Sequence, residues 1–284
     1  MSATVTQQRT IARRPSIGIR MRFAFTDGLL LTKRNLLRYL RIPTLLVFST
    51  VQPVMFVLLF RYVFGGAISG VGSNYVNYLM PGIFVQTAIF GATQTGVGLA
   101  EDLGKGIIDR FRSLPMARSA VLAGRTTADL FRNLFVVLLM TGVGYLVGFR
   151  FEHGAVFAVL GIGLAISVGF AFSWVSALIG LGIKDVESVQ AASFVWIFPL
   201  TFASSAFVPP STFPSWLQTW ARINPVSIWC NTLRAFTSGI DIVRLTTGNP
   251  NLTTGKLVLE SALYVIGILA VFVPLAIRSY RRAS

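Results

Sequence analysis

Few residues in this sequence have a type and spacing that could support catalysis. His153 is the single histidine and Cys230 the single cysteine of the chain. An intrachain disulfide and a cysteine-rich metal site are therefore excluded, and neither a catalytic triad nor a metal centre is predicted. Gly98 and Gly104-Lys105 approximate the phosphate-loop pattern G-x-x-x-x-G-K, but the spacing has one extra residue and Gly106 replaces the required Ser or Thr. We expect no catalytic site in this chain, so ATP-driven work would need a second chain that binds the nucleotide.

The densest cluster of charged residues lies in Glu101–Arg125, which reads EDLGKGIIDRFRSLPMARSAVLAGR between two long apolar runs. Leu103, Ile107, Phe111 and Leu114 recur every three to four residues, which predicts an amphipathic helix over 101–115. Proline lacks a backbone N–H and disfavours helical geometry in the residue before it, so we expect the helix to end at Pro115. We interpret this segment as a cytoplasmic docking helix; the alternative is a positively charged loop that only fixes topology.

Composition places the chain in a membrane. Hydrophobic residues make up 54% of the sequence and charged residues only 12%, and the mean hydropathy is +0.68. A soluble domain carries about a quarter charged residues. The apolar runs are continuous rather than alternating, which favours helical spans over a β-barrel. The predicted fold class is therefore an all-α integral membrane protein.

The predicted elements follow from the order of polar and apolar segments. Residues 1–15 are polar and basic, and we expect them to be disordered. Residues 16–42 alternate bulky apolar and basic side chains, which predicts an interfacial amphipathic helix rather than a flexible basic tail. Residues 279–284 form a basic C-terminal tail. Between them, six transmembrane helices are expected at about 43–64, 78–100, 126–149, 155–183, 189–207 and 257–277.

The distribution of basic residues gives the orientation. Most Lys and Arg residues lie before the first span, in Glu101–Arg125 and after the last span, so both termini are expected in the cytoplasm. The segment 208–240 then lies outside. Its prolines and tryptophans predict short helices at head-group depth that form an outer re-entrant cap. The cap candidates are Phe207, Pro209, Pro214, Trp216, Trp220, Asn224 and Pro225.

The middles of the predicted spans contain mildly polar and aromatic residues but no ionisable side chain. Ion-coupled transporters usually place such groups in the membrane, so their absence argues against ion coupling. Asp129 and Arg132, near an inner end, could pair on one helix face. The polar residues could hold helices together or line a path for an amphipathic solute. The substrate-path candidates are Gln86, Thr93, Gln94, Phe194, Trp196, Phe198 and Phe202.

The segments GIIDRFRSLPMARSAVLAGR and FASSAFVPPSTFPSWLQTWARINPVSIWCNTLR, with a basic N-terminal helix and six spans, resemble the permease subunits of ABC-2-type exporters. The resemblance covers about residues 19–278 and is closest to the daunorubicin-resistance-type drug permeases. It implies the type V exporter transmembrane fold, a second permease copy or homologue, and a separate ATPase subunit that binds ATP and Mg. Residues implied to contact that subunit are Glu101, Ile107, Arg110, Phe111, Arg112, Leu114 and Pro115.

The expected function is therefore that of a permease subunit in an ATP-driven exporter of the bacterial plasma membrane. Its cargo would be an amphipathic drug, a lipid or a related hydrophobic compound, and no cofactor would bind to this chain. The strong positive charge, +15, is attributed to lipid head groups rather than nucleic acid. Alternatives are an ion-coupled secondary transporter or flippase, an exporter of polysaccharide or glycolipid, and a membrane scaffold or channel.

Overall fold

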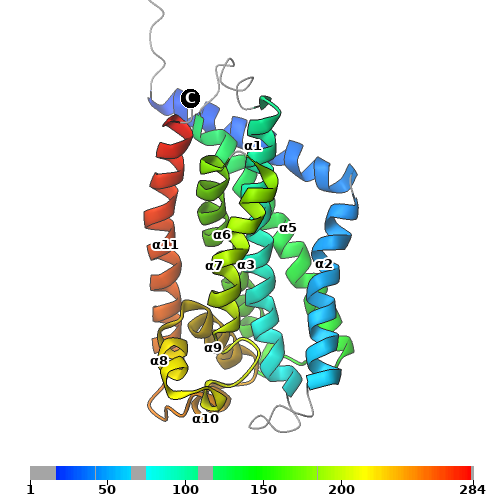
Figure 1. The fold of residues 1–284 in the computed structure, drawn as a ribbon, viewed down its shortest axis with the longest axis vertical. Helices are drawn as coiled ribbons and strands as arrows, with labels where there is room; N and C mark the ends of the chain where they lie inside the picture. The colour runs from blue at the N-terminus through cyan, green and yellow to red at the C-terminus, as the bar shows by residue number, and fades with distance from the viewer. Residues whose placement is uncertain (1–16, 42, 65–74, 108–117, 184, 283–284) are drawn as a thin grey trace, which may run out of the picture.

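The structure is a computed structural model that describes residues 17–41, 43–64, 75–107, 118–183 and 185–282. Within these ranges every regular element is a helix. Figure 1 shows an elongated bundle with α1 lying across one end, where the C-terminus also lies, and α8, α9 and α10 gathered at the other end. We refer to these as the α1 end and the α8–α10 end.

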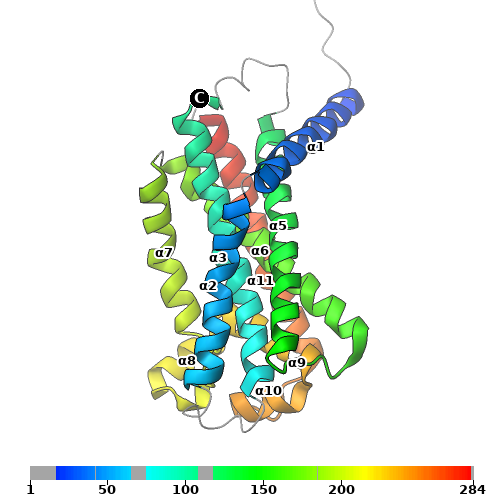
Figure 2. The ribbon, with the colours of Figure 1, turned by 90° about the vertical axis from the view of Figure 1, so that its right-hand side faces the viewer.

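The first half of the chain supplies the crossing helix and three bundle helices. α1 (Ile17–Arg41) is followed by α2 (Pro43–Leu58), which continues as a π-helical turn, η1 (Leu59–Phe64). α3 (Tyr75–Gly104) and α5 (Arg118–Leu146) come next. α1 packs mainly against α5, and Figure 2 shows it leaving the bundle at an angle to the other helices.

The second half completes the bundle and builds the α8–α10 end. α6 (Gly154–Gly182) and α7 (Val186–Phe202) are joined by a short connection in which Asp185 caps α7 by accepting a hydrogen bond from the backbone N–H of Ser188. The short helices are η3 (Pro210–Thr212), α8 (Ser215–Ile223), α9 (Pro225–Thr237) and α10 (Ile240–Thr247). α11 (Thr254–Arg282) then returns along the whole bundle to the α1 end.

α3 is the central helix, with most of its residues buried. It packs most extensively against α6, and glycines allow the two backbones to approach closely. A Cβ atom at Gly96 would lie 2.4 Å from the carbonyl oxygen of Ser176, and one at Gly180 would lie 2.3 Å from that of Gly96. A side chain at either glycine would therefore force the two helices apart.

Among the described residues, four helices are long and apolar enough to cross a membrane: Tyr75–Gly104, Val121–Leu146, Gly154–Gly182 and Thr254–Arg282. Two shorter apolar helices cover Ser49–Phe64 and Val186–Phe202. These segments overlap the six apolar runs identified in the sequence. The structure therefore supports a multi-pass membrane protein made of helices.

Several helix boundaries differ from the predicted ones. α5 begins at Arg118 and ends at Leu146, before Gly148, whose φ of +100° is incompatible with helix. α7 ends at Phe202 rather than near residue 207, because the chain turns there. α11 continues to Arg282, so the first part of the predicted tail is helical. Residues 1–15 lie outside the described residues.

The start of the predicted docking helix also needs correction. Glu101 and Leu103 belong to the last turn of α3, which ends at Gly104. Gly106 has a φ of +65°, a left-handed conformation that glycine adopts without steric cost and that commonly terminates helices. The apolar stripe starting at Leu103 is therefore interrupted before Ile107. Residues 108–117 are outside the part of the chain that the structure describes.

Candidate functional site

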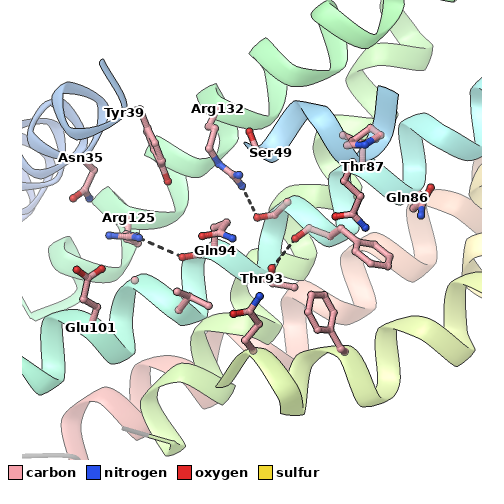
Figure 3. Close-up of a pocket in the computed structure, with 18 of the residues that line it drawn as sticks. Asn35, Tyr39, Ser49, Gln86, Thr87, Thr93, Gln94, Glu101, Arg125 and Arg132 are labelled. Carbon is pink, nitrogen blue, oxygen red and sulfur yellow. Dashed lines mark hydrogen bonds between the residues drawn. The ribbon is translucent and has the colours of Figure 1, made fainter. Parts of the chain in front are cut away.

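A cavity of about 340 Å³ opens along the central helix α3, flanked by α2 and α7. At the α1 end it is lined by side chains of α1 and α5, including Tyr39, Arg125 and Arg132 (Figure 3). Its remaining lining includes amides and phenyl rings, besides small residues and the carboxylate of Glu101. The glutamines are Gln52, Gln86, Gln94 and Gln190, and the phenylalanines are Phe56, Phe90 and Phe194.

The structure brings together some of the predicted substrate-path residues. Gln86, Thr93, Gln94 and Phe194 line the cavity. Trp196 does not, because it lies on the opposite side of α7, where its ring stacks on Phe172 with a centroid distance of 5.5 Å. A helix places residues 194 and 196 about 200° apart, so these two rings point in opposite directions.

Phe198 and Phe202 also lie outside the cavity lining, but they extend its aromatic surface along α7. Ring centroids are 5.5 Å apart between Phe194 and Phe198, 5.4 Å between Phe198 and Phe202, and 5.1 Å between Phe202 and Phe207. Phe207 in turn stacks on Phe60 of η1 at 4.7 Å. This aromatic row, Phe194–Phe198–Phe202–Phe207, runs from the cavity towards the α8–α10 end.

The cavity contains buried polar atoms without a protein partner. Two side-chain oxygens, Oε1 of Gln86 and Oγ1 of Thr87, are buried. Neither has a hydrogen-bond partner among the described residues. Leaving such groups unpaired costs about 1–3 kcal/mol each. Both residues line the cavity, so rotation of either side chain towards it would bring these oxygens to water or a ligand and remove this cost. This stretch of α3 is therefore a candidate contact for a bound molecule.

A buried ionic cluster closes the cavity at the α1 end, and Asp129 of α5 is its centre. The Asp129 carboxylate is fully buried and accepts hydrogen bonds from the hydroxyls of Tyr39, at 2.5 Å, and Thr95. It also pairs with Arg132, at 3.6 Å from Nε, and with Arg125, at 3.9 Å from Nε. One carboxylate therefore connects α1, α3 and α5.

The cluster extends to the end of α3 through a second buried carboxylate. Asp102 lies 3.9 Å from Nη1 of Arg125 and 3.4 Å from Nη2 of Arg34 on α1. Thr32 of α1 donates a hydrogen bond to the carbonyl oxygen of Gly124 at 3.3 Å. α1 is thus fixed to the bundle by charges and hydrogen bonds as well as by apolar packing.

Two glycines of α3 provide the space for the two buried arginines. A Cβ atom at Gly98 would lie 1.5 Å from Nη2 of Arg125, and one at Gly91 would lie 3.2 Å from Nη2 of Arg132. The arginines hydrogen-bond to the α3 backbone beside these gaps, Arg125 to the Gln94 carbonyl at 3.3 Å and Arg132 to the Gly91 carbonyl (Figure 3).

The sequence suggested the Asp129–Arg132 pair, which the structure confirms, but not the larger cluster. Arg125 was assigned to the charged loop, because the predicted span began after it, whereas it lies inside α5 and is buried. The sequence does contain an indication of this contact between α5 and α3. The two glycines, Gly91 and Gly98, are seven residues apart, and so are the two arginines, Arg125 and Arg132. That spacing brings them together in antiparallel helices.

Of the predicted coupling residues, the structure describes Glu101 and Ile107. Both are partly buried, and Glu101 Oε1 pairs with Nζ of Lys105 at 2.6 Å. They line a groove of about 490 Å³ between α1 and the end of α3, together with Arg34 and Arg41. Arg110, Phe111, Arg112, Leu114 and Pro115 lie outside the described residues.

The predicted cap residues separate into buried and exposed groups. Phe207, Pro209 and Asn224 are buried, Pro225 is partly buried, and Pro214, Trp216 and Trp220 are exposed. Asn224 caps α9 by accepting from the N–H of Val226 at 2.9 Å, and its amide donates to the carbonyl oxygen of Leu200 at 2.8 Å. Asn224 therefore fixes the end of α7 to the start of α9.

Arg234 of α9, which the sequence placed in an outer loop, is fully buried. Its guanidinium donates to the carbonyl oxygens of Tyr78, Ser205 and Ala206 at 3.0, 2.6 and 3.1 Å. It also lies 3.6 Å from the centroid of the Tyr78 ring. No described carboxylate pairs with it, so oriented backbone carbonyls compensate its charge and hold α9, α3 and the turn after α7 together.

Comparison with known proteins is consistent with this architecture. Residues 27–236 match the family described as ABC-2 type transporter. The chain is 35% identical over 251 residues to the daunorubicin resistance ABC transporter permease protein DrrB1 of Streptomyces coeruleorubidus, covering 88% of this chain and 84% of that protein. It is 28% identical over 287 residues to the probable doxorubicin resistance ABC transporter permease protein DrrC of Mycobacterium tuberculosis, covering 100% and 99% respectively. The chain belongs to the ABC-2 type transporter family of membrane permeases.

Proposed function

We propose that this chain is the permease subunit of an ATP-driven exporter whose cargo is an amphipathic compound with an aromatic or otherwise flat apolar part. The observation that carries the proposal is the cavity on α3, with phenyl rings beside buried polar atoms that have no partner in the described part of the chain. Phenyl rings favour flat apolar groups, and the unpaired polar atoms need hydrogen-bonding groups on the ligand. The names of the two drug-resistance relatives support the same class of cargo.

The aromatic row gives a direction to the proposed path. It continues from Phe194 at the cavity to Phe207 beside the α8–α10 end, where Arg234 and Asn224 fix the short helices to the bundle. A cargo that leaves the cavity would exchange one ring contact for the next along α7. We propose that the bundle spans the bacterial plasma membrane six times, with both termini in the cytoplasm and the α8–α10 end outside.

The energy for transport would come from an ABC ATPase subunit that binds ATP and Mg and docks at the α1 end. The groove between α1 and the end of α3 is partly lined by Glu101 and Ile107, and Ile107 is followed in the sequence by the segment that contains Arg112. Because α1, α3 and α5 share the Asp129 cluster, force applied at this end would move them together. Arg112→Glu is expected to lower transport and its coupling to ATP hydrolysis without unfolding the bundle; unchanged export would contradict this docking site.

We further propose that two permeases associate in the working transporter. α2 and α7 flank the cavity and expose apolar side chains, among them Val51, Met55 and Val195, which are 43%, 62% and 76% exposed. A second permease packed on this side would cover them and enlarge the cavity to a shared path. Crosslinking of cysteines introduced at these positions tests the arrangement.

Ion-coupled transport is less consistent with the chemistry of the bundle. Asp129 is the fully buried carboxylate of α5, and two arginines and two hydroxyls already surround it. Both oxygens of this carboxylate already have hydrogen-bond or ion-pair partners, so it offers no open position for a coupling ion. Transport that survives ATP depletion and stops when the proton gradient collapses would favour the ion-coupled reading over ours.

The decisive experiment reconstitutes the chain with a candidate ABC ATPase in vesicles and measures uptake of daunorubicin, a fluorescent probe of the proposed class. We expect ATP-dependent uptake, and a half-saturating concentration that rises about two- to tenfold in Phe194→Ala, since an aromatic contact contributes about 0.5–1.5 kcal/mol. Phe131→Ala is the control, because Phe131 is 48% exposed on α5 and does not line the cavity. Equal effects of the two substitutions would refute the assignment of the cavity.

A further inference from the structure

A polar pocket of about 670 Å³ lies at the α8–α10 end, separate from the cavity on α3. Its lining comes from η3, α8, α9, the end of α10 with the residues that follow it, and the start of α11. Its charged residues are Arg222, Lys256 and Glu260, and the amides of Gln218 and Asn249 line it as well. The pocket therefore combines cationic groups with neutral hydrogen-bonding groups.

The charges in this pocket do not balance. Nζ of Lys256 lies 3.8 Å from Oε1 of Glu260, one helical turn further along α11. Arg222 is exposed, and no carboxylate among the described residues forms an ion pair with it. The lining therefore carries one surplus positive charge, which favours an anionic group of a ligand.

A shallow apolar groove of about 510 Å³, lined by α11 alone, begins at the same Glu260 and follows this helix towards the α1 end. It is formed by Leu263, Tyr264, Gly267 and residues up to Phe272, and a Cβ atom at Gly267 would meet nothing within 4 Å. Residues 260–272 span about 18 Å at 1.5 Å per residue. This length is close to half of the roughly 30 Å hydrocarbon core of a bilayer.

The depth of the two pockets in a membrane is indicated by α8. Trp216, Trp220 and Ile223 are 71%, 44% and 59% exposed and lie on one face of this helix. Tryptophan prefers the boundary between head groups and acyl chains. The hydroxyl of Tyr264 donates to the carbonyl oxygen of Ile223 at 3.0 Å and so fixes this boundary against α11. Figure 1 shows α8 at the same end of the bundle as the start of α11.

We propose that the polar pocket and the α11 groove together bind one anionic glycerophospholipid from the leaflet at the α8–α10 end. The phosphate lies at Arg222 and Lys256, the remaining head group contacts the amides of the pocket, and an acyl chain occupies the groove over Gly267. A polar pocket alone would accept any small anion, and a groove alone any lipid. The pocket and the groove meet at Glu260, at the level of the exposed tryptophans. Together they therefore select a molecule that has both an anionic head group and an acyl chain.

The test measures lipid binding to the purified full-length chain in a neutral detergent, by native mass spectrometry with added dioleoyl phosphatidylglycerol or dioleoyl phosphatidylcholine. We expect selective retention of phosphatidylglycerol. Arg222→Gln with Lys256→Gln should weaken that binding by about tenfold or more, because charge-assisted hydrogen bonds to the phosphate are lost. Both side chains are exposed, so the fold should be unaffected, as checked by the unfolding temperature without added lipid.

Two further variants separate the parts of the site. Gly267→Phe fills the groove and should weaken phosphatidylglycerol binding while leaving the polar pocket intact. Arg61→Gln removes one positive charge from η1, outside both pockets, and should leave binding unchanged. Equal retention of phosphatidylcholine, a loss in Arg61→Gln as large as that in the double variant, or full binding by Gly267→Phe would each overturn the proposal. Because the readout is binding, it is independent of the proposed transport activity.

Discussion

Replacing Asp129 by asparagine tests the central role of the buried ionic cluster. The substitution keeps the shape of the side chain but removes the charge that compensates Arg125 and Arg132, which are 7% and 3% exposed. It also replaces one acceptor oxygen by an amide that faces the donating hydroxyls of Tyr39 and Thr95. Two arginines would then remain buried with incomplete compensation.

Removing one partner of a buried ion pair costs about 3–5 kcal/mol. At about 2–4 °C per kcal/mol, a scaling taken from soluble domains, Asp129→Asn should lower the unfolding temperature by about 6–20 °C. The assay is thermal unfolding of the purified chain in detergent, followed by intrinsic tryptophan fluorescence. Since Asp129 fixes α1 to the bundle, hydrogen exchange at residues 31–41 should rise in parallel.

The matched control is Asp241→Asn. The Asp241 side chain is 90% exposed and pairs with Arg244 at 3.1 Å on the surface of α10, so its loss should leave the unfolding temperature unchanged. A second control replaces Asp129 by leucine and both arginines by methionine. Exchanging a whole buried ionic group for apolar residues is often close to neutral. The reasoning is refuted if Asp129→Asn unfolds at the wild-type temperature or behaves like Asp241→Asn.

Three further predictions concern other parts of the structure. Gly98→Ala should lower the unfolding temperature strongly, because the added methyl group would displace the Arg125 guanidinium. Gly142→Ala should leave it unchanged, because an added Cβ atom there has no neighbour within 4 Å. Equal stability of the two variants would contradict the described packing. Arg234→Met should destabilise the α8–α10 end and raise its hydrogen exchange, since it removes the charge-assisted hydrogen bonds to three buried carbonyls, each worth about 1.5–3 kcal/mol. Unchanged exchange would argue against this role. Burial and the nearby Asp129 carboxylate raise the pKa of Tyr39 above its ordinary value of 10.0. Folding therefore favours the neutral phenol. The contribution of this phenol to the free energy of unfolding is fully present below pH 10 and is lost as the pH rises through the higher folded-state pKa. Tyr39→Phe should accordingly reduce stability by the same amount at pH 6 and pH 9, measured by unfolding at both values, and a strongly pH-dependent difference in this interval would show that the phenol ionises there.

The sequence was sufficient to predict the class of fold and the positions of most long helices. Runs of about 20 apolar residues follow directly from the thickness of a bilayer, so the apolar segments of α3, α5, α6 and α11 could be read from hydropathy. Helix ends were less predictable, because they depend on local conformations such as the positive φ of Gly106 and Gly148. Hydropathy does not report these dihedral angles.

The candidate site was predictable only in part, because periodicity gives the face of a helix but not its neighbour. Gln86 and Phe194 were both singled out by residue type, and they line one cavity. Trp196 was grouped with Phe194 although its ring packs on Phe172 instead. Arg234 was assigned only to the outer side, and its burial was not predicted, since the backbone carbonyls that compensate it come from segments distant in sequence.

Arg125 and Arg132 occupy the space left by the missing side chains of Gly98 and Gly91 on α3, and this packing restricts how the transporter can change shape. Sliding α5 along α3 by one turn would drive the Arg125 guanidinium into the side chains that flank Gly98, and rotating it would separate Asp129 from Thr95. This packing therefore opposes sliding or rotation of α5 against α3. We therefore expect opening and closing at the borders with α2 and α7, beside the cavity, so probes of conformational change belong on those two helices.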